Sequence, residues 1–518
     1  MPKNVVVFSD GTGQDGGVRP EQRISNIYKL YWASRNHPAN AIEPRDQVAF
    51  YDAGLGTDIG ATAVTAPVRF VQKLLGSVAG EGIKRNIEDC YEFIINHYQA
   101  GDRIFVFGFS RGAYTARCVA NLLMLCGVPT KSPSGPVMRF RKAVRDIAEE
   151  AVDTVLEHGA GHPRADYEAE RRELARRFQA KYGSGDGAES NVAPYFVGVF
   201  DTVAALGATG MRSKVIHVGL GLGVAIGVAL CSFVPALILA VILKGVWGIG
   251  VTGLVTAIIL LSIVIVEVLF WYKQKASKRK TIRDFPNKGD VKTHDADWKG
   301  ANFDLALDPR VNHARSANAI DETRKDFDRV GWKPISAKAS ERPDDGNLIQ
   351  MWFAGNHSDV GGSYPESESR LSDVALAWMA HQATEVPDGL KTGPIFVKGE
   401  KIPATANVGE CLYIYPSADG VQHCEVAGMQ DTLANYAAKW PKWVGRLIAG
   451  KGWEIKVRDI KPDAPVDESV DQRFNLPLVI QCAGTGPYRP KALKDHEKFK
   501  HLYPVDGPVQ SHTGTVAR

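Results

Sequence analysis

The chain has 518 residues, of which 44% are apolar and 23% are charged, as is typical of globular proteins. Its 62 basic and 58 acidic side chains nearly balance, and the net charge of +4 excludes the basic excess of a nucleic-acid-binding protein. Seven cysteines are scattered without a C-x-x-C pair, so we expect reduced thiols and neither a zinc site nor a disulfide scaffold. No metal and no cofactor are expected. The first apolar run, VVVF, is too short for the core of a signal peptide.

Outside one long apolar segment, short apolar runs alternate with helical stretches. The runs typical of buried parallel strands are residues 5–8, 48–51, 104–107, 195–200 and 349–353. Helices are predicted between them, among others over residues 78–99 and 112–125. This order predicts an α/β fold with a mostly parallel sheet and helices on both faces.

The predicted sheet is divided by two insertions. Residues 139–182 form a charged helical insert, which is either a lid or a solvated helical layer. An aromatic helix is expected around Trp440 and Trp443. The domain organisation is therefore a first part of the α/β domain over 1–210, an apolar hairpin with basic flanks over 211–280, a second part of that domain over 281–395, and a C-terminal mixed α/β region over 396–518.

The segment 215–272 is apolar almost throughout, with Lys244 and Glu267 as its interior charges. On each side of Lys244 it exceeds the roughly 20 residues that a helix needs to cross a bilayer. We therefore expect an inserted transmembrane hairpin of two helices that turns at Lys244. The alternative is a buried helical pair in a large soluble core.

Basic residues flank this segment on both sides and predict its orientation. Arg212 and Lys214 precede it, and residues 273–280 contain five further lysines and arginines. Positive flanks favour the cytoplasmic side, so both ends and the α/β domain should lie there. Gly219, Gly223 and Gly227 recur every four residues, a stripe that favours close helix contact within the hairpin or in a homo-oligomer.

The strongest motif is Gly108-Phe109-Ser110-Arg111-Gly112, a G-x-S-x-G between an apolar strand and an apolar-periodic helix. In a nucleophile elbow the serine lies in a strained strand-to-helix turn, and the glycines let neighbouring backbone pass. The context predicts that Ser110 is a catalytic nucleophile. The alternative is a structural serine that caps the helix.

A nucleophilic serine needs a base and an acid, and two strand ends supply them. The strand over 195–200 ends at Asp201, and the strand over 349–353 runs into a turn that ends at His357. Carboxyl ends of parallel strands meet at one edge of a sheet, where the elbow presents its serine. The alternatives are a helix-capping aspartate and an ordinary turn histidine. Asp359 is the second candidate for the acid.

The turn after the first strand completes the expected site. The backbone N–H of Arg111 and the turn containing Asp10 and Gly11 are the candidate oxyanion donors. An ordinary βα-turn aspartate is the alternative. A phosphate loop is disfavoured because neither G-x-x-x-x-G-K-[ST] nor G-x-G-x-x-G follows this strand.

Taken together, these motifs resemble those of a bacterial family of α/β-hydrolase-domain proteins that includes the type VI secretion phospholipase effectors. The resemblance implies an α/β-hydrolase-like fold for the α/β domain, a triad of Ser110, Asp201 and His357, and a lipolytic activity. It also implies that the membrane is a bacterial inner membrane. The chain has SDGTG where members of the family often have FDGTxN. The apolar segment is either a second departure from the family pattern or a feature of a subgroup. The matching stretches are FSDGTG, FYDAGLGT, GFSRGAYTAR, VFDTVAALG, WFAGNHSDVGGSY and YRPKAL.

The expected function is that of a membrane-anchored serine hydrolase which cleaves carboxylic esters of membrane lipids through an acyl-enzyme. Membrane lipids are the expected partners. Two alternatives remain open: a membrane-inserting scaffold or toxin with a vestigial hydrolase fold, and an esterase for soluble substrates.

Overall fold

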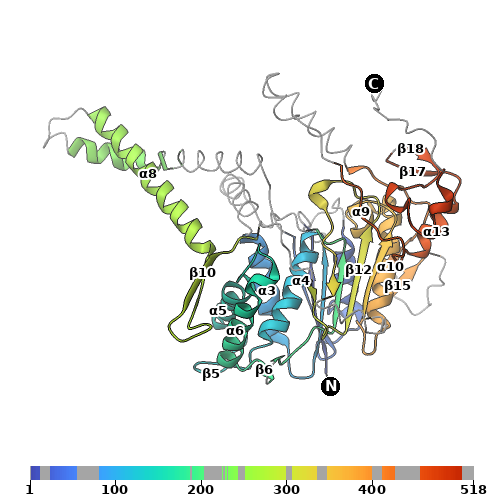
Figure 1. Ribbon diagram of the computed structural model, residues 1–518, viewed down its shortest axis with the longest axis horizontal. Coiled ribbons are helices and arrows are strands. Elements are labelled where there is room, and N and C mark those ends of the chain that lie inside the picture. Colours follow the sequence, from blue (N-terminus) through green and yellow to red (C-terminus); the bar gives the residue numbers. More distant parts are fainter. Residues whose placement is uncertain are drawn as a thin grey trace.

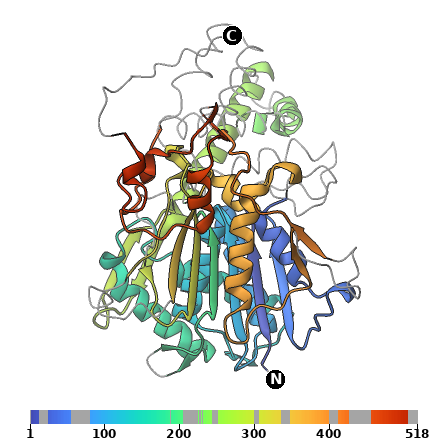
Figure 2. The same ribbon diagram turned by 90° about the vertical axis from the view of Figure 1, so that its right-hand side faces the viewer.

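The computed structural model covers the sheet, its helices and part of the apolar segment. The chain enters the sheet from the lower end in Figures 1 and 2, where the label N stands. The described residues are 2–11, 24–54, 81–186, 189–203, 225, 228–229, 231–242, 251–298, 306–334, 347–398, 411–425, 455–482 and 484–504.

The core of the fold is a six-stranded sheet in which every neighbouring pair is parallel, in the order β14-β12-β8-β3-β1-β2. All five strands predicted from the sequence are present, and β12 is an additional strand. Because β1 begins near the N-terminus, the carboxyl ends of all six strands lie at the upper end in Figure 1. The strands are β1 (Asn4–Ser9), β2 (Gln47–Asp52), β3 (Arg103–Phe109), β8 (Phe196–Phe200), β12 (His313–Ala319) and β14 (Leu348–Phe353).

Successive side chains of the central strands enter different cores. Val5 and Val7 of β1 pack into one hydrophobic cluster, whereas Val6 and Phe8 pack into another. All four are fully buried. Since side chains alternate across a strand, a continuous apolar run is expected wherever both faces of a sheet are covered.

Helices cover both faces of the sheet. On one face lie α3 (Glu81–His97) and α4 (Arg111–Cys126). The other face is covered by α1 (Asn26–Ser34) and α10 (Arg370–Thr384), the latter in front of the strands in Figure 2. The charged insert forms an outer layer on α3 and α4, with α5 (Lys142–Glu150), the π-helical turn η2 (Ala151–Leu156) and α6 (Arg164–Tyr182).

Smaller elements complete the described structure. The short α9 (His357–Gly361) follows β14, and α13 (Glu468–Asn475) belongs to a C-terminal cluster packed on Trp352. The two-residue strands pair as β4 (Lys131–Ser132) with β5 (Gly135–Pro136), β6 (Gly185–Asp186) with β7 (Glu189–Ser190), and β11 (Ala306–Leu307) with β13 (Lys333–Pro334). The longer pairs are β9 (Arg279–Arg283) with β10 (Val291–Asp295), β15 (Ile395–Val397) with β16 (Leu412–Ile414), and β17 (Val479–Gln481) with β18 (Gly484–Gly486).

The apolar segment contributes one long helix, α8 (Val251–Lys278), which projects away from the sheet in Figure 1. Among the described residues it is the one helix with the length and apolar composition to span a membrane. The helix Cys231–Ile242 packs on its first turns through Ala236, Ala240 and Val255, but is shorter than a crossing requires. Part of the expected first crossing, including its glycine stripe, and the turn at Lys244 lie outside the described residues.

Two expectations from the sequence need correction. Cys424 and Cys482 form a disulfide, whereas all seven cysteines were expected to be reduced. The fold brings together two residues that are 58 positions apart, which their spacing could not reveal. No strand was predicted from the sequence between residues 285 and 345, but this region contributes β12, which lies between β14 and β8. The helix expected around Trp440 and Trp443 lies outside the described residues.

Candidate active site

Ser110 lies between the end of β3 and the start of α4. Its φ of 58° and ψ of −122° are unusual for a residue with a side chain, and it is buried. The flanking glycines permit this turn: a Cβ on Gly108 would lie 2.3 Å from the carbonyl oxygen of Gly112, and one on Gly112 would lie 2.2 Å from that of Ser9. Such strain persists only where the surrounding structure enforces it, which is typical of a nucleophile elbow.

Asp201 and His357 meet at the same edge of the sheet. The His357 Nδ1 atom lies 2.7 Å from Asp201 Oδ2, and both side chains are buried. The other oxygen of Asp201 accepts the backbone N–H of Ala319, at the end of β12, at 3.1 Å. Asp201 also has a positive φ, of 33°. Its carboxylate is therefore fixed from two sides and can hold the His357 ring with Nδ1 protonated.

Two contacts bring Ser110 to this pair. The Ser110 N–H donates to the carbonyl of Phe200, the residue before Asp201, at 3.1 Å. The ring of Phe109, the residue before Ser110, stacks on His357 at a centroid distance of 4.7 Å. Nε2 of His357 is buried and has no hydrogen-bond partner within the described residues, Ser110 included. This free nitrogen is the atom that a general base would use.

Arg458 is a third partner of the pair that the sequence did not indicate. It is buried, and its Nη2 donates to Asp201 Oδ2 at 2.9 Å, the same oxygen that faces His357. Burial alone would raise the pKa of Asp201, but the charge of Arg458 and the hydrogen bond from His357 outweigh it and lower this pKa. Asp201 therefore remains ionised at neutral pH.

Asp359, the second candidate for the acid, faces a different histidine. Its carboxylate accepts the backbone N–H of Asn356 at 3.0 Å and lies 2.7 Å from Nδ1 of His423. The first contact is part of a capping box that begins α9 at His357. Asp359 thus positions the turn that carries His357, whereas Asp201 contacts the His357 ring.

The expected oxyanion donors also lie at this edge. Arg111 is the first residue of α4, so its N–H has no acceptor within the helix. Gly11 adjoins the elbow, since a Cβ placed on it would lie 3.4 Å from Ser110 Cβ. However, the Gly11 N–H donates to Asp10 Oδ1 at 2.7 Å, and Asp10 also accepts from Tyr51 at 2.6 Å. Burial raises the pKa of Asp10 to about 6.

A family model decides the relationship of the chain. The model of the catalytic domain of Tle1-like phospholipase effectors of type VI secretion matches residues 3–219 and 272–382. The chain belongs to this family. The interval between the two matched parts, residues 220–271, lies within the apolar segment and contains the helix Cys231–Ile242 and most of α8.

Individual relatives are distant. The chain is 23% identical over 467 residues to an uncharacterized protein of Saccharomyces cerevisiae, YEL023C, covering 83% of this chain and 64% of the yeast protein. A crystal structure of an uncharacterized Pseudomonas aeruginosa protein aligns with 15% identity and a TM-score of 0.33, covering 76% of this chain and 47% of that one. The Tle1 effector, solved bound to the VgrG spike, aligns with 18% identity and a TM-score of 0.24, covering 70% and 52%. The chain therefore spans between about half and two thirds of these proteins.

Proposed function

We propose that the chain is a serine hydrolase that cleaves carboxylic esters of phospholipids. The observation that carries the proposal is the buried pair of Asp201 and His357, joined at 2.7 Å beside a serine in a nucleophile-elbow conformation. Membership of the Tle1-like phospholipase effector family supports a lipid ester as the substrate.

The proposed mechanism is acyl transfer to water. His357 Nε2 removes the proton of Ser110 as its Oγ attacks the ester carbonyl, and it then protonates the leaving alcohol. Asp201 keeps Nδ1 of His357 protonated and stabilises the positive imidazolium. The Arg111 N–H is the proposed donor to the oxyanion. Water then cleaves the acyl-enzyme, again with His357 as base, and releases a fatty acid.

We further propose that the apolar segment anchors the enzyme in the bilayer that holds its substrate, as a hairpin with both ends on the cytoplasmic side. The support is the exposed apolar surface of α8 and the basic residues at its end, such as Lys275 and Lys278. Figures 1 and 2 show α8 toward the same upper end as the carboxyl edge of the sheet. Substrate drawn from the bilayer would then reach the side of the molecule that carries Ser110.

Lipid analysis tests this function directly. The full-length protein is reconstituted into vesicles of mixed phospholipids, and the lipids are followed by mass spectrometry, with Ser110→Ala as the control. We expect free fatty acid and lysophospholipid from the wild type and neither from the variant. Cleavage of short soluble esters without any attack on the vesicles would instead favour the soluble-substrate esterase. No hydrolysis of either substrate by folded protein would refute an enzyme function.

A further inference from the structure

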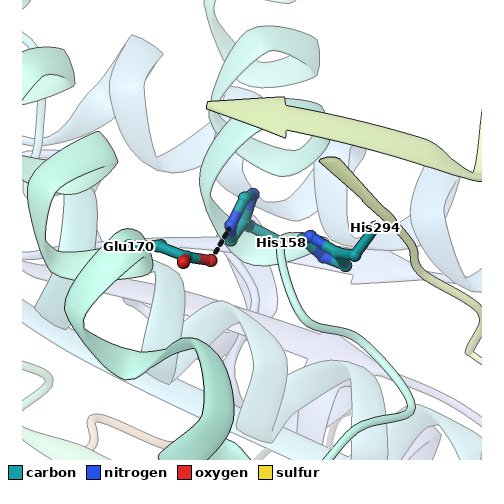
Figure 3. A group of neighbouring side chains, drawn as sticks. All are labelled: His158, Glu170 and His294. Carbon is teal, nitrogen blue, oxygen red and sulfur yellow. Dashed lines mark hydrogen bonds and ion pairs between the residues drawn. The ribbon is translucent and has the colours of Figure 1, made fainter. Parts of the chain in front are cut away.

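A second cluster of polar side chains lies where the membrane arm joins the helical insert. By membrane arm we mean α8 together with β9 and β10, which follow it. Figure 3 shows the cluster: His158 follows η2, Glu170 lies on α6, and His294 comes from β10. One nitrogen of each histidine and one oxygen of Glu170 all lie within 4.8 Å of one another.

The cluster is well ordered by its surroundings. His158 is 1% exposed, and its Nε2 lies 3.1 Å from Glu170 Oε2. The His294 ring stacks on Tyr167 at a centroid distance of 4.0 Å and meets the His158 ring edge to face at 4.4 Å. Two imidazoles and a carboxylate are therefore held together before any ligand arrives, which lowers the entropy cost of binding one.

The chemistry of the three side chains matches a borderline divalent transition metal. Neutral imidazole with one carboxylate is a common ligand set for Zn²⁺, whereas Ca²⁺ and Mg²⁺ prefer oxygen ligands alone. Tetrahedral bonds of about 2.0–2.2 Å place ligand atoms roughly 3.4 Å apart. The His158–Glu170 separation is already close to this value.

We propose that His158, Glu170 and His294 form a binding site for a divalent transition metal of the Zn²⁺ class, which ties the membrane arm to the helical insert. The proposal is independent of the hydrolase activity. Its structural consequence follows from connectivity, because β10 pairs with β9 and β9 continues directly from α8. An ion bound here would cross-link the base of the arm to the layer that covers α3 and α4.

Other contacts across the same junction show that the membrane arm and the helical insert pack together without a metal. Lys280 of β9 forms an ion pair with Glu157 at 2.5 Å, and Trp298 donates to the same carboxylate at 2.7 Å. The backbone N–H of Asp297 donates to the carbonyl of Ala160 at 3.0 Å. A metal would therefore reinforce an interface that forms without it.

Two existing hydrogen bonds compete with the metal and sharpen the test. Lys292 lies 3.0 Å from Glu170 Oε1, and the Gly159 N–H donates to His294 Nε2 at 3.0 Å. The Lys292 side chain is about half exposed, so it can move away when an ion arrives. Removing its charge should make Glu170 a better ligand, whereas an ordinary polar cluster would only lose a contact.

Metal binding is measured on the full-length protein in detergent after treatment with a chelator. We expect isothermal titration with Zn²⁺ to give one site per chain and to raise the unfolding temperature, and Mg²⁺ to give neither. His158→Ala, Glu170→Gln and His294→Ala should each weaken binding by about 100-fold or more. His381→Ala, at an exposed histidine of α10, is the control and should bind as the wild type does.

Lys292→Met keeps all three proposed ligands, so it tests the proposal even if the ligand variants fail to fold. We expect it to bind Zn²⁺ more tightly than the wild type, with an unchanged circular dichroism spectrum. Equal Zn²⁺ binding by the wild type and by folded His158→Ala and His294→Ala variants would overturn the proposal. Absence of a saturable site in the folded wild type would overturn it as well. The cluster would then be a set of structural hydrogen bonds and ring contacts between the membrane arm and the helical insert.

Discussion

The sheet and α8 contain the same kinds of apolar residues in opposite surroundings. Val106 and Phe107 of β3 are fully buried, because helices cover both faces of the sheet. In α8, Val264 and Leu261 are 57% and 60% exposed, and none of the described residues forms a layer over them. An apolar run therefore does not by itself specify what will cover it. The sheet provides its own cover, whereas we propose that a bilayer, which a helix of this length can span, covers α8.

The two regions also differ in what they do for the proposed reaction. The carboxyl edge of the sheet is fixed by many short contacts, and both Ser110 and Asp201 are held there with positive φ angles. The membrane arm meets the rest of the molecule through the β9–β10 ribbon and its contacts with the insert. We therefore expect chemistry to depend on the edge of the sheet and access to lipid to depend on the arm.

The largest effect is expected at the edge of the sheet. Ser110→Ala, Asp201→Ala and His357→Ala should each lower kcat/KM for a phospholipid by roughly 10⁴- to 10⁶-fold, because the three side chains act as a unit. For the same reason a double variant should be little worse than the worst single one. Hydrolysis assays with circular dichroism as the folding control check this. An Asp201→Ala variant with nearly full activity would show that another carboxylate is the acid.

A matched pair of substitutions compares an apolar residue in the core of the sheet with an exposed apolar residue of α8. Phe107→Ala should destabilise the catalytic domain by about 3–5 kcal/mol, since it opens a cavity in the core. Leu261→Ala, at an exposed position of α8, should leave the unfolding of that domain unchanged. Denaturant titration in detergent, followed by tryptophan fluorescence, measures both. Equal destabilisation by the two substitutions would mean that α8 packs into the protein core.

Removing the apolar segment should divide the two regions functionally. Replacing residues 215–272 with a short flexible linker should leave hydrolysis of soluble short-chain esters unchanged, because the free energy of loop closure varies only slowly with length. Activity on vesicles at low lipid concentration should fall about 10²-fold, since the enzyme loses its high local concentration at the bilayer. Unchanged activity on vesicles would show that the segment does not serve substrate capture.

The smallest effect is expected from Arg458→Met, which should change the pH dependence of activity and of stability. Without this charge, burial is free to raise the pKa of Asp201, so its ionised fraction falls at a higher pH and the acidic limb of the kcat/KM profile moves upward. Ionised Asp201, whose pKa is now lowered, stabilises the fold at neutral pH and loses this contribution only at acidic pH. As the pH is lowered, the variant should therefore begin to unfold at a higher pH than the wild type does. Arg458→Lys keeps the charge and should restore both profiles.

The sequence predicted the strands whose composition matches their burial and missed the one whose composition does not. β12 reads HARSANA, and its Ser316 and Asn318 are buried polar residues. The Asn318 amide donates to the carbonyl of Met351 at 3.0 Å, so the strand satisfies its polar groups within the fold. No periodicity in the sequence signals such a strand, although its last residue, Ala319, helps to hold Asp201.

The candidate site could be predicted where short sequence patterns determine the geometry. Ser110 lies in a pentapeptide whose glycines are required because a side chain there would clash with neighbouring backbone. Asp201 and His357 follow the ends of strands that meet at one edge of the sheet. Arg458 has neither kind of signal, because it lies far along the chain in no recognisable pattern and reaches Asp201 only through tertiary packing. The hydrogen bond from the Gly11 N–H to Asp10 likewise depends on side-chain geometry that the turn sequence does not specify.

Labelling with a fluorophosphonate tests the central claim most directly. The reagent phosphonylates a serine only when a neighbouring base activates it, so it reports on Ser110 without any assumption about the lipid. Our account predicts one labelled site in the folded full-length protein, located on Ser110 by peptide mass spectrometry, and no labelling of Ser110→Ala or His357→Ala. Labelling of a different serine, or hydrolysis of phospholipid by Ser110→Ala at the wild-type rate, would contradict it.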